Sequence, residues 1–151
     1  MQKKPTNSIL QQFSEKCQQY NLKVTPQRMA IYRELLKSAN HPTANTMYQL
    51  IKNEFPNISF DTVNRTLLTL AQIGLVDLVE VYGGAKRFDP NTANHHHLHC
   101  IACGKIVDFF NDDYNHLKIP KNIRQGFSAL SSRVVLKGIC KKCSKQGKMI
   151  S

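Results

Sequence analysis

The spacing of apolar positions predicts four helices in the first half of the chain. The clearest follows Ser59, an expected N-cap, and ends at Gly74. Its apolar residues recur at i, i+4, i+7 and i+8, on one face of a helix: Val63, Leu67, Leu70 and Ala71. The remaining faces are polar and are expected to face outward: Thr62, Asn64, Arg65, Thr66 and Thr69.

Three earlier helices are predicted from their first residues. The segment "ILQQFSEKC" is expected to form a helix capped by Ser8. In "VTPQRMAIYRELLKSAN", Thr25 is the expected N-cap, and Pro26 occupies the first turn, where its missing N–H costs nothing. In "HPTANTMYQLIKNEF", Thr43 is the expected N-cap, and three residues are expected to face inward: Met47, Leu50 and Ile51.

The segment "LVDLVEVYGGAKRFD" alternates apolar and polar residues around Gly83 and Gly84. This pattern predicts a β-hairpin. Short helices followed by a two-stranded hairpin are the element order of a winged helix-turn-helix. The alternative is a small helical bundle with an incidental hairpin.

The chain changes character near Asp89, where "DPNTAN" (residues 89–94) is a turn-rich connector. Beyond it lie a histidine-rich segment, a predicted strand "KIVDFF", a polar stretch broken by Pro120, and a second predicted strand "SRVVLKGI". The sequence therefore predicts an α+β protein in which residues 1–88 form one domain and residues 95–151 a second, smaller one.

The composition favours a polyanionic partner. The 151 residues hold 21 Lys+Arg against 10 Asp+Glu, a formal net charge of +11. Simple solubility is the alternative explanation of this charge. No apolar run reaches the ~18 residues of a membrane helix, and the N-terminus lacks a secretory signal pattern, so a cytoplasmic location is expected.

Four of the five cysteines form two CxxC pairs, separated by 36 residues: Cys100, Cys103, Cys140 and Cys143. Each pair makes a knuckle that points two sulfurs at one ion, and two knuckles complete the tetrahedron of a structural Zn²⁺. Redox pairs of the thioredoxin type and unrelated buried thiols are the alternatives. A site closed by four sulfurs has no open position, so one structural Zn²⁺ per subunit is expected.

The stretch "NHHHLHC" suggests a second kind of metal site. If the segment is extended, His95, His97 and His99 share one face, while His96 points the other way. Imidazoles suit Zn, Fe, Cu and Ni, and nearby carboxylates such as Asp89 and Asp108 would shift the preference toward Mn or Fe(II). A solvated histidine-rich loop is the alternative.

These segments together resemble the ferric uptake regulator family of bacterial metal-dependent repressors. The resemblance covers nearly the whole chain, through "VTPQR", "HPTANTMY", "FPNISFDTVNRTL", "GLV", "RFD", "HHHLHCIACGKIVDF" and "GICKKC". It implies a winged-helix DNA-binding domain (1–88), a hinge (89–94) and an α/β dimerisation domain (95–151). It also implies a homodimer on a pseudo-palindromic operator of double-stranded DNA, rather than an enzyme.

The resemblance implies a regulatory Fe²⁺ or Mn²⁺, one per subunit, with these ligands: His41, Asp89, His95, His97 and Asp108. Three histidines with two aspartates look most like the peroxide-responsive (PerR) branch, where Fe(II) reacts with H₂O₂ and a ligand histidine is oxidised. His41 and His95 would then be the targets. An iron- or zinc-responsive regulator without peroxide sensing is the alternative. Ser132 stands where many members have a histidine ligand, so no second sensing site is expected.

The resemblance also implies the DNA contacts. Four residues are expected to reach bases and phosphates: Ser59, Thr62, Asn64 and Arg65. Three others are expected to reach phosphates: Arg28, Lys86 and Arg87. The family usually has Tyr at the position of Asn64, and Asn can pair with adenine instead. Outside the family, a metal-dependent hydrolase would leave the N-terminal half without a purpose. A metal-storage or interaction module is a further alternative, and it predicts no sequence-specific DNA binding with any metal.

Overall fold

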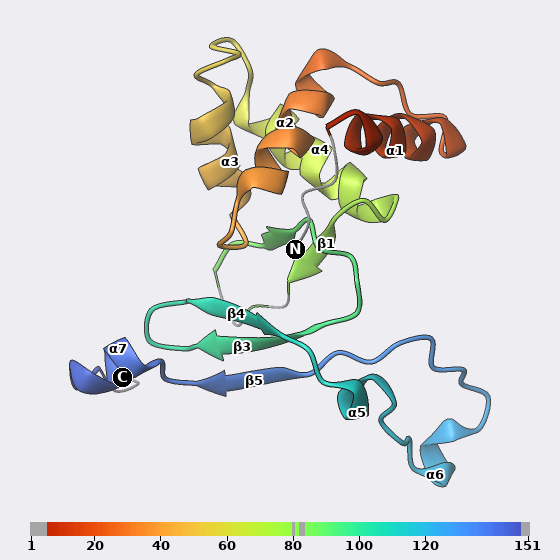
Figure 1. Cartoon of the computed structure of the whole chain (residues 1–151), viewed down its shortest axis with the longest axis vertical. Coiled ribbons are helices and arrows are strands. Elements are labelled where there is room, and N and C mark those ends of the chain that lie inside the picture. Colours follow the sequence, from red (N-terminus) through yellow and green to blue (C-terminus); the bar gives the residue numbers. More distant parts are fainter. Residues whose placement is uncertain (1–5, 80, 82–83, 149–151) are drawn as a thin grey trace. The chain divides into compact units, whose positions relative to one another are not determined.

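The computed structural model describes residues 6–79, 81 and 84–148, which divide into two compact units. Unit 1 is Met1–Thr92 and unit 2 is Ala93–Ser151. The division falls inside the connector that the sequence marks at residues 89–94. Unit 1 contains four helices and two strands (Figure 1): α1 (Thr6–Gln19), α2 (Pro26–Lys37), α3 (Ala44–Ile51), α4 (Phe60–Gln72), β1 (Asp77–Val79) and β2 (Arg87–Asp89).

The starts of three helices are those that the sequence predicts. The hydroxyls of Thr25, Thr43 and Ser59 each accept a hydrogen bond from a backbone N–H three residues later. The prediction that Ser8 caps the first helix is wrong, because α1 already begins at Thr6. Positions 6 and 7 are Thr6 and Asn7. Neither is a glycine or a proline, so nothing in these two residues prevents the helix from starting before Ser8.

The helices of unit 1 enclose a continuous apolar core. Val63, Leu67 and Leu70 of α4 have no exposed surface, as predicted. Two expectations are wrong: Leu50 is 42% exposed, and Thr66 is buried. The short helix α3 buries the i, i+3, i+7 stripe of Ala44, Met47 and Ile51, which leaves Leu50 outside the stripe. Thr66 lies three residues after Val63 and so borders the buried stripe of α4.

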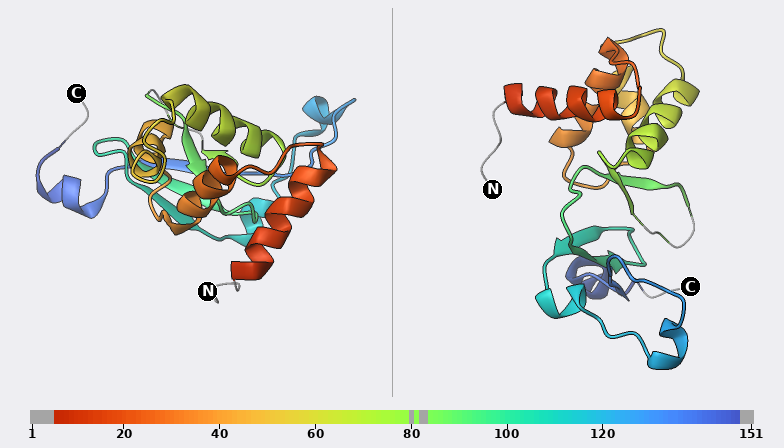
Figure 2. Two further views of the ribbon diagram at one scale, coloured as in Figure 1. Left: turned by 90° about the horizontal axis from the view of Figure 1, so that it is seen from above. Right: turned by 90° about the vertical axis from the view of Figure 1, so that its right-hand side faces the viewer.

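Helix α1, in red, lies alongside α2 in both views of Figure 2. The rings of Phe13 and Tyr32 stack there with their centroids 5.1 Å apart. Cys17 is fully buried on the same helix, and burial raises the pKa of its thiol. A buried neutral thiol is a poor nucleophile, so Cys17 is a core residue.

The hairpin of unit 1 is antiparallel and pairs Leu78 with Phe88. Gly83 lies outside the described residues, whereas Gly84 has a φ of 77°, which favours glycine. Phe88 is completely buried in the core, so β2 is anchored to the helices. Helices followed by this hairpin confirm the predicted winged helix-turn-helix.

Unit 2 is built on a three-stranded sheet in the order β4-β3-β5 (Figure 1). Its elements are β3 (His96–Cys100), β4 (Ile106–Phe109), α5 (Asp112–Asn115), α6 (Lys121–Arg124), β5 (Val135–Gly138) and α7 (Lys141–Lys145). Strand β3 is antiparallel to β4 and parallel to β5. The parallel pair needs a long crossover, which the segment with α5 and α6 provides. The histidine-rich stretch is therefore a central strand, not a solvated loop.

Very little apolar surface is buried in unit 2. Among its described residues, the buried apolar side chains are Cys100, Ile106 and Cys143. Leu98, by contrast, pairs in register with Val107 on one side and Leu136 on the other, and each is 43–45% exposed. These three side chains form an apolar row across one face of the sheet. Within the described ranges, no helix is long and apolar enough to cross a membrane.

Candidate metal centres and the exposed helix of unit 1

The two CxxC pairs meet at one end of the sheet in unit 2. Cys100 ends β3 and Cys143 lies in α7, and the four sulfur atoms all lie within 4.8 Å of one another. The sulfurs of Cys103 and Cys140 are 3.9 Å apart. Zn–S bonds of about 2.3 Å give a tetrahedron with edges of about 3.8 Å, whereas a disulfide needs about 2.05 Å. The five cysteines are thiols, and the four fit one zinc ion.

The backbone around the cluster favours a thiolate. The N–H of Cys140 donates to the sulfur of Cys100 at 3.3 Å. This bond, with the N–H of Cys103, lowers the pKa of Cys100 to about 6. Burial, with a smaller contribution from the charge of Cys100, raises the pKa of Cys143 to about 12, so a second thiolate is unfavourable there without a cation. A divalent ion would remove that conflict, which supports a metal site over a redox pair.

A second group of candidate metal ligands lies in unit 2, with His97 on β3, Asp108 on β4 and His95 immediately before β3. The Nε2 atoms of His95 and His97 are 3.0 Å apart. Oδ1 of Asp108 is 3.3 Å from Nε2 of His97 and 3.7 Å from that of His95. Donors about 2.1 Å from an octahedral ion are about 3.0 Å apart when adjacent. These three atoms therefore fit one triangular face of an octahedron, the two-histidine, one-carboxylate arrangement that suits Fe(II).

The tautomer of His95 agrees with this role. Its Nδ1 lies 2.6 Å from the carbonyl oxygen of Ala93. A carbonyl only accepts hydrogen bonds, so Nδ1 carries the proton and Nε2 presents a lone pair. A hydrogen bond of this kind fixes the ring of a ligand histidine and raises its basicity.

His96 points away from that group, as the alternation along a strand predicts. Its Nδ1 accepts a hydrogen bond from the N–H of Val134 at 3.0 Å. Its Nε2 therefore carries the proton and donates to Oδ1 of Asn115 at 2.9 Å. Both ring nitrogens of His96 are used within unit 2, which is a physical reason to expect no further ion there. His99 is buried near the cysteine cluster, and we assign it no role.

The remaining two predicted ligands lie together in unit 1. Nε2 of His41 is 3.2 Å from Oδ2 of Asp89, and both side chains are about 95% buried. His41 precedes α3 and has a φ of 50°. Left-handed backbone costs a non-glycine residue roughly 1–2 kcal/mol. The neighbouring structure must therefore hold His41 in place.

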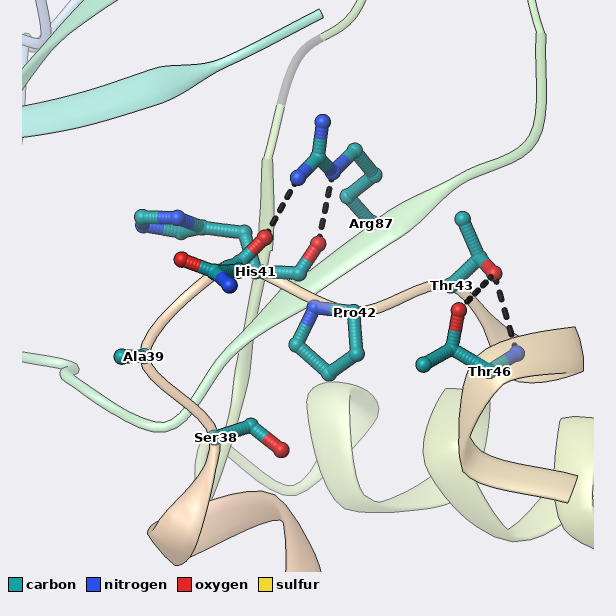
Figure 3. A pocket seen from close by; sticks show the side chains of 8 residues that line it. Ser38, Ala39, His41, Pro42, Thr43, Thr46 and Arg87 are labelled. Atoms are coloured by element: carbon teal, nitrogen blue, oxygen red, sulfur yellow. Dashed lines mark hydrogen bonds between the residues drawn. The ribbon is translucent and has the colours of Figure 1, made fainter. Parts of the chain in front are cut away.

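The sequence does not predict the contacts of Arg87. Its Nε donates to the carbonyl of His41 at 2.6 Å, and its Nη2 donates to the carbonyl of Asn40 (Figure 3). Its partial burial lowers the pKa of the guanidinium. Two N–H groups of Arg87 are thus engaged by backbone carbonyls within unit 1, and its contact with phosphate stays a prediction.

Helix α4 presents the residues expected to read DNA. The Arg65 side chain is 78% exposed, and its Nε lies 2.9 Å from Oδ2 of Asp61, one turn earlier. Ser59 is exposed too, but its hydroxyl caps the helix. Asp61 was missed as a partner of Arg65, although their i,i+4 spacing is the signal that predicts such a pair.

Two further predicted phosphate contacts lie elsewhere in unit 1. Arg28 is half-buried on α2, and its Nη1 donates to the carbonyl of Lys23 at 2.6 Å. Lys86 is exposed immediately before β2. Both positions leave a cationic group at the surface of unit 1, with Lys86 the freer to reach a phosphate.

Residues 19–137 match the ferric uptake regulator family. The chain is 39% identical over 125 residues to the peroxide-responsive repressor PerR of Staphylococcus aureus, covering 83% of this chain and 84% of that protein. It resembles the structure of the Campylobacter jejuni peroxide stress regulator, with 31% identity, a TM-score of 0.61 and coverage of 89% and 98%. The Helicobacter pylori ferric uptake regulator shares the fold, with a TM-score of 0.76, 22% identity and coverage of 95% and 97%.

Proposed function

Because this chain belongs to the ferric uptake regulator family, we propose that it is a metal-dependent transcriptional repressor that responds to hydrogen peroxide. The observation that carries the proposal is the convergence of His95, His97 and Asp108, a ligand set suited to Fe(II), in a relative of peroxide-responsive repressors. The repressor binds double-stranded DNA as a homodimer.

The regulatory ion takes ligands from both units in this proposal. Unit 1 contributes His41 and Asp89, and unit 2 contributes His95, His97 and Asp108. Binding free energy then selects the arrangement of the units that fits DNA. If about 1% of the metal-free protein were competent for DNA, an ion that favours this state about 10⁴-fold would invert the ratio.

The peroxide response rests on the choice of ion. Fe²⁺ bound at this site would supply electrons for the reduction of H₂O₂. His41 and His95 would be among the ligands that hold the ion, and they are the imidazoles expected to be oxidised. Oxidation of either ring weakens its hold on the ion and releases DNA. An iron-responsive regulator without peroxide chemistry is the second candidate, since the chain belongs to the ferric uptake regulator family.

Peroxide treatment of the Fe²⁺-loaded full chain is expected to add the mass of one oxygen to a peptide that contains His41 or His95. DNA binding is expected to fall in parallel, because an oxidised imidazole is a poorer ligand. Peptide mass spectrometry and gel retardation of a DNA selected from a random library measure the two effects. Protein loaded with Mn²⁺ is the control and should keep both mass and binding; unchanged mass with Fe²⁺ would favour the iron-responsive alternative.

DNA is read by the exposed side of α4 in this proposal, through Ser59, Thr62, Asn64 and Arg65. Arg28 and Lys86 provide phosphate contacts. A homodimer presents two such helices, so the operator is pseudo-palindromic. Before DNA arrives, the guanidinium of Arg65 lies in an exposed ion pair with Asp61 one turn earlier on α4.

The Arg65→Ala variant is expected to bind its selected DNA about 5- to 150-fold more weakly, the equivalent of roughly 1–3 kcal/mol for a lost base contact. It should also discriminate less against a base change at one position of each half-site. Fluorescence anisotropy with matched and single-mismatch duplexes measures both. Arg33→Ala, which removes an exposed arginine paired with Glu54 on unit 1, is the control for lost charge. Equal losses in the two variants would leave Arg65 without a specific role.

The second copy of the chain covers the apolar row of Leu98, Val107 and Leu136 in this proposal. A monomer would leave these three side chains in contact with water on an exposed sheet face. Other exposed apolar residues of unit 2 add to the surface that the partner can bury: Phe110, Leu117, Ile123, Phe127 and Leu130.

A further inference from the structure

The contacts of Arg87 follow from the alternation of side chains along β2. Arg87 and Asp89 are two residues apart and so point to one face of the strand, while Phe88 between them enters the core. On that face, the guanidinium of Arg87 donates to the carbonyls of His41 and Asn40 (Figure 3). Asp89 reaches the imidazole of the same His41 at 3.2 Å. One strand therefore holds both the backbone and the side chain of His41.

Two backbone contacts complete the attachment. The N–H of Phe88 donates to the carbonyl of Pro42 at 3.0 Å, and Thr43 forms a β-bridge with Arg87. Thr43 is also the N-cap of α3. The segment from Asn40 to Thr43 is thus tied to β2 at successive residues, up to the first turn of a core helix.

The segment needs such ties because its backbone is strained. His41 has a φ of 50°, which few non-glycine residues adopt. Residues 38–43 also line a cavity of about 270 Å³, although the His41 side chain itself is buried. If the carbonyls of Asn40 and His41 lost their donors, the backbone could relax and carry the imidazole away from Asp89.

We propose that Arg87 is a positioning residue that holds His41 and Asp89 in their ion-binding arrangement before the regulatory ion arrives. The inference rests on the proposed function, since it assigns a role toward the ion of that site. Arginine suits the task because its planar fork presents two N–H groups at once to two neighbouring carbonyls. Lysine carries the same charge but offers no planar fork.

The test compares Mn²⁺ binding by the zinc-loaded full chain with binding by Arg87→Ala and Arg87→Lys. If about a tenth of the Arg87→Ala molecules keep the arrangement, the dissociation constant for Mn²⁺ rises about tenfold. Arg87→Lys should fall between this variant and the parent. Hydrogen exchange of the amides of residues 40–46 in metal-free protein should be faster in Arg87→Ala. Arg33→Ala should match the parent in both measurements.

Two results would overturn the inference. The first is parental Mn²⁺ affinity in a folded Arg87→Ala variant; if that variant also lost DNA binding at saturating Mn²⁺, Arg87 would be a phosphate contact instead. If Arg87→Ala does not fold, Arg87→Lys decides, and parental Mn²⁺ affinity in that variant is the second. A parent that binds no Mn²⁺ would instead overturn the proposed function, and this inference with it.

Discussion

Replacing Cys100 and Cys140 by serine is expected to remove the bound zinc and leave unit 2 unfolded. Structural zinc contributes roughly 10–16 kcal/mol of apparent binding free energy, as much as the roughly 5–15 kcal/mol that keeps a whole domain folded. Unit 2 buries only Cys100, Ile106 and Cys143 among its described apolar residues, so packing cannot replace the ion. Zinc analysis, circular dichroism and sedimentation should show no zinc, less ordered structure and no dimer.

Cys17→Ser is the matched control for this pair of substitutions. Cys17 is a buried thiol of unit 1 and lies outside the four-sulfur cluster. This variant should keep one zinc per chain and remain dimeric, with some loss of stability in unit 1. A double serine variant that stayed folded and dimeric without zinc would show that the cluster is not structural.

Joint replacement of His41 and Asp89 by alanine is expected to abolish the effect of Mn²⁺ on DNA binding. The variant loses every ligand that unit 1 contributes to the proposed ion. An ion held by unit 2 alone binds with the same affinity whether or not the two units are arranged to fit DNA, so it cannot favour DNA binding. Its DNA affinity with Mn²⁺ should stay within about twofold of its affinity without the metal. Fluorescence anisotropy across a Mn²⁺ titration provides the measurement.

His116→Ala is a suitable control for this experiment. It removes an imidazole that is 79% exposed and lies 4.0 Å from the carboxylate of Asp112. The zinc content of all variants should stay at one per chain. If the joint variant bound DNA as strongly as the parent, and with the same dependence on Mn²⁺, the two units would not share an ion.

Local signals explain why much of the fold was predictable. The N-cap residues Thr25, Thr43 and Ser59 accept hydrogen bonds from backbone N–H groups only three residues later, so the helix starts can be predicted from the local sequence. The zinc cluster was predictable too, because each CxxC pair is itself local and two such pairs have few other uses. Leu50 and Thr66 were misplaced because burial at the margin of a helical stripe depends on the neighbouring helix.

The ligand residues of the proposed regulatory site could be predicted from residue chemistry and from the family resemblance, but the contacts that position them could not. Strand alternation predicted that His95 and His97 share a face, and the structure brings Asp108 of the next strand to them. The contacts of Arg87 could not be predicted from the sequence. In the sequence it is a basic residue beside Lys86 on a wing, but its acceptors are carbonyls 46 and 47 residues away. Only tertiary structure creates that contact.

The described residues of unit 2 bury few apolar side chains, and this has a consequence for a newly made chain. A newly made chain that has found neither zinc nor a second copy exposes its C-terminal half to proteases. Chains synthesised in excess of the available zinc are therefore expected to be degraded faster than chains that have bound zinc.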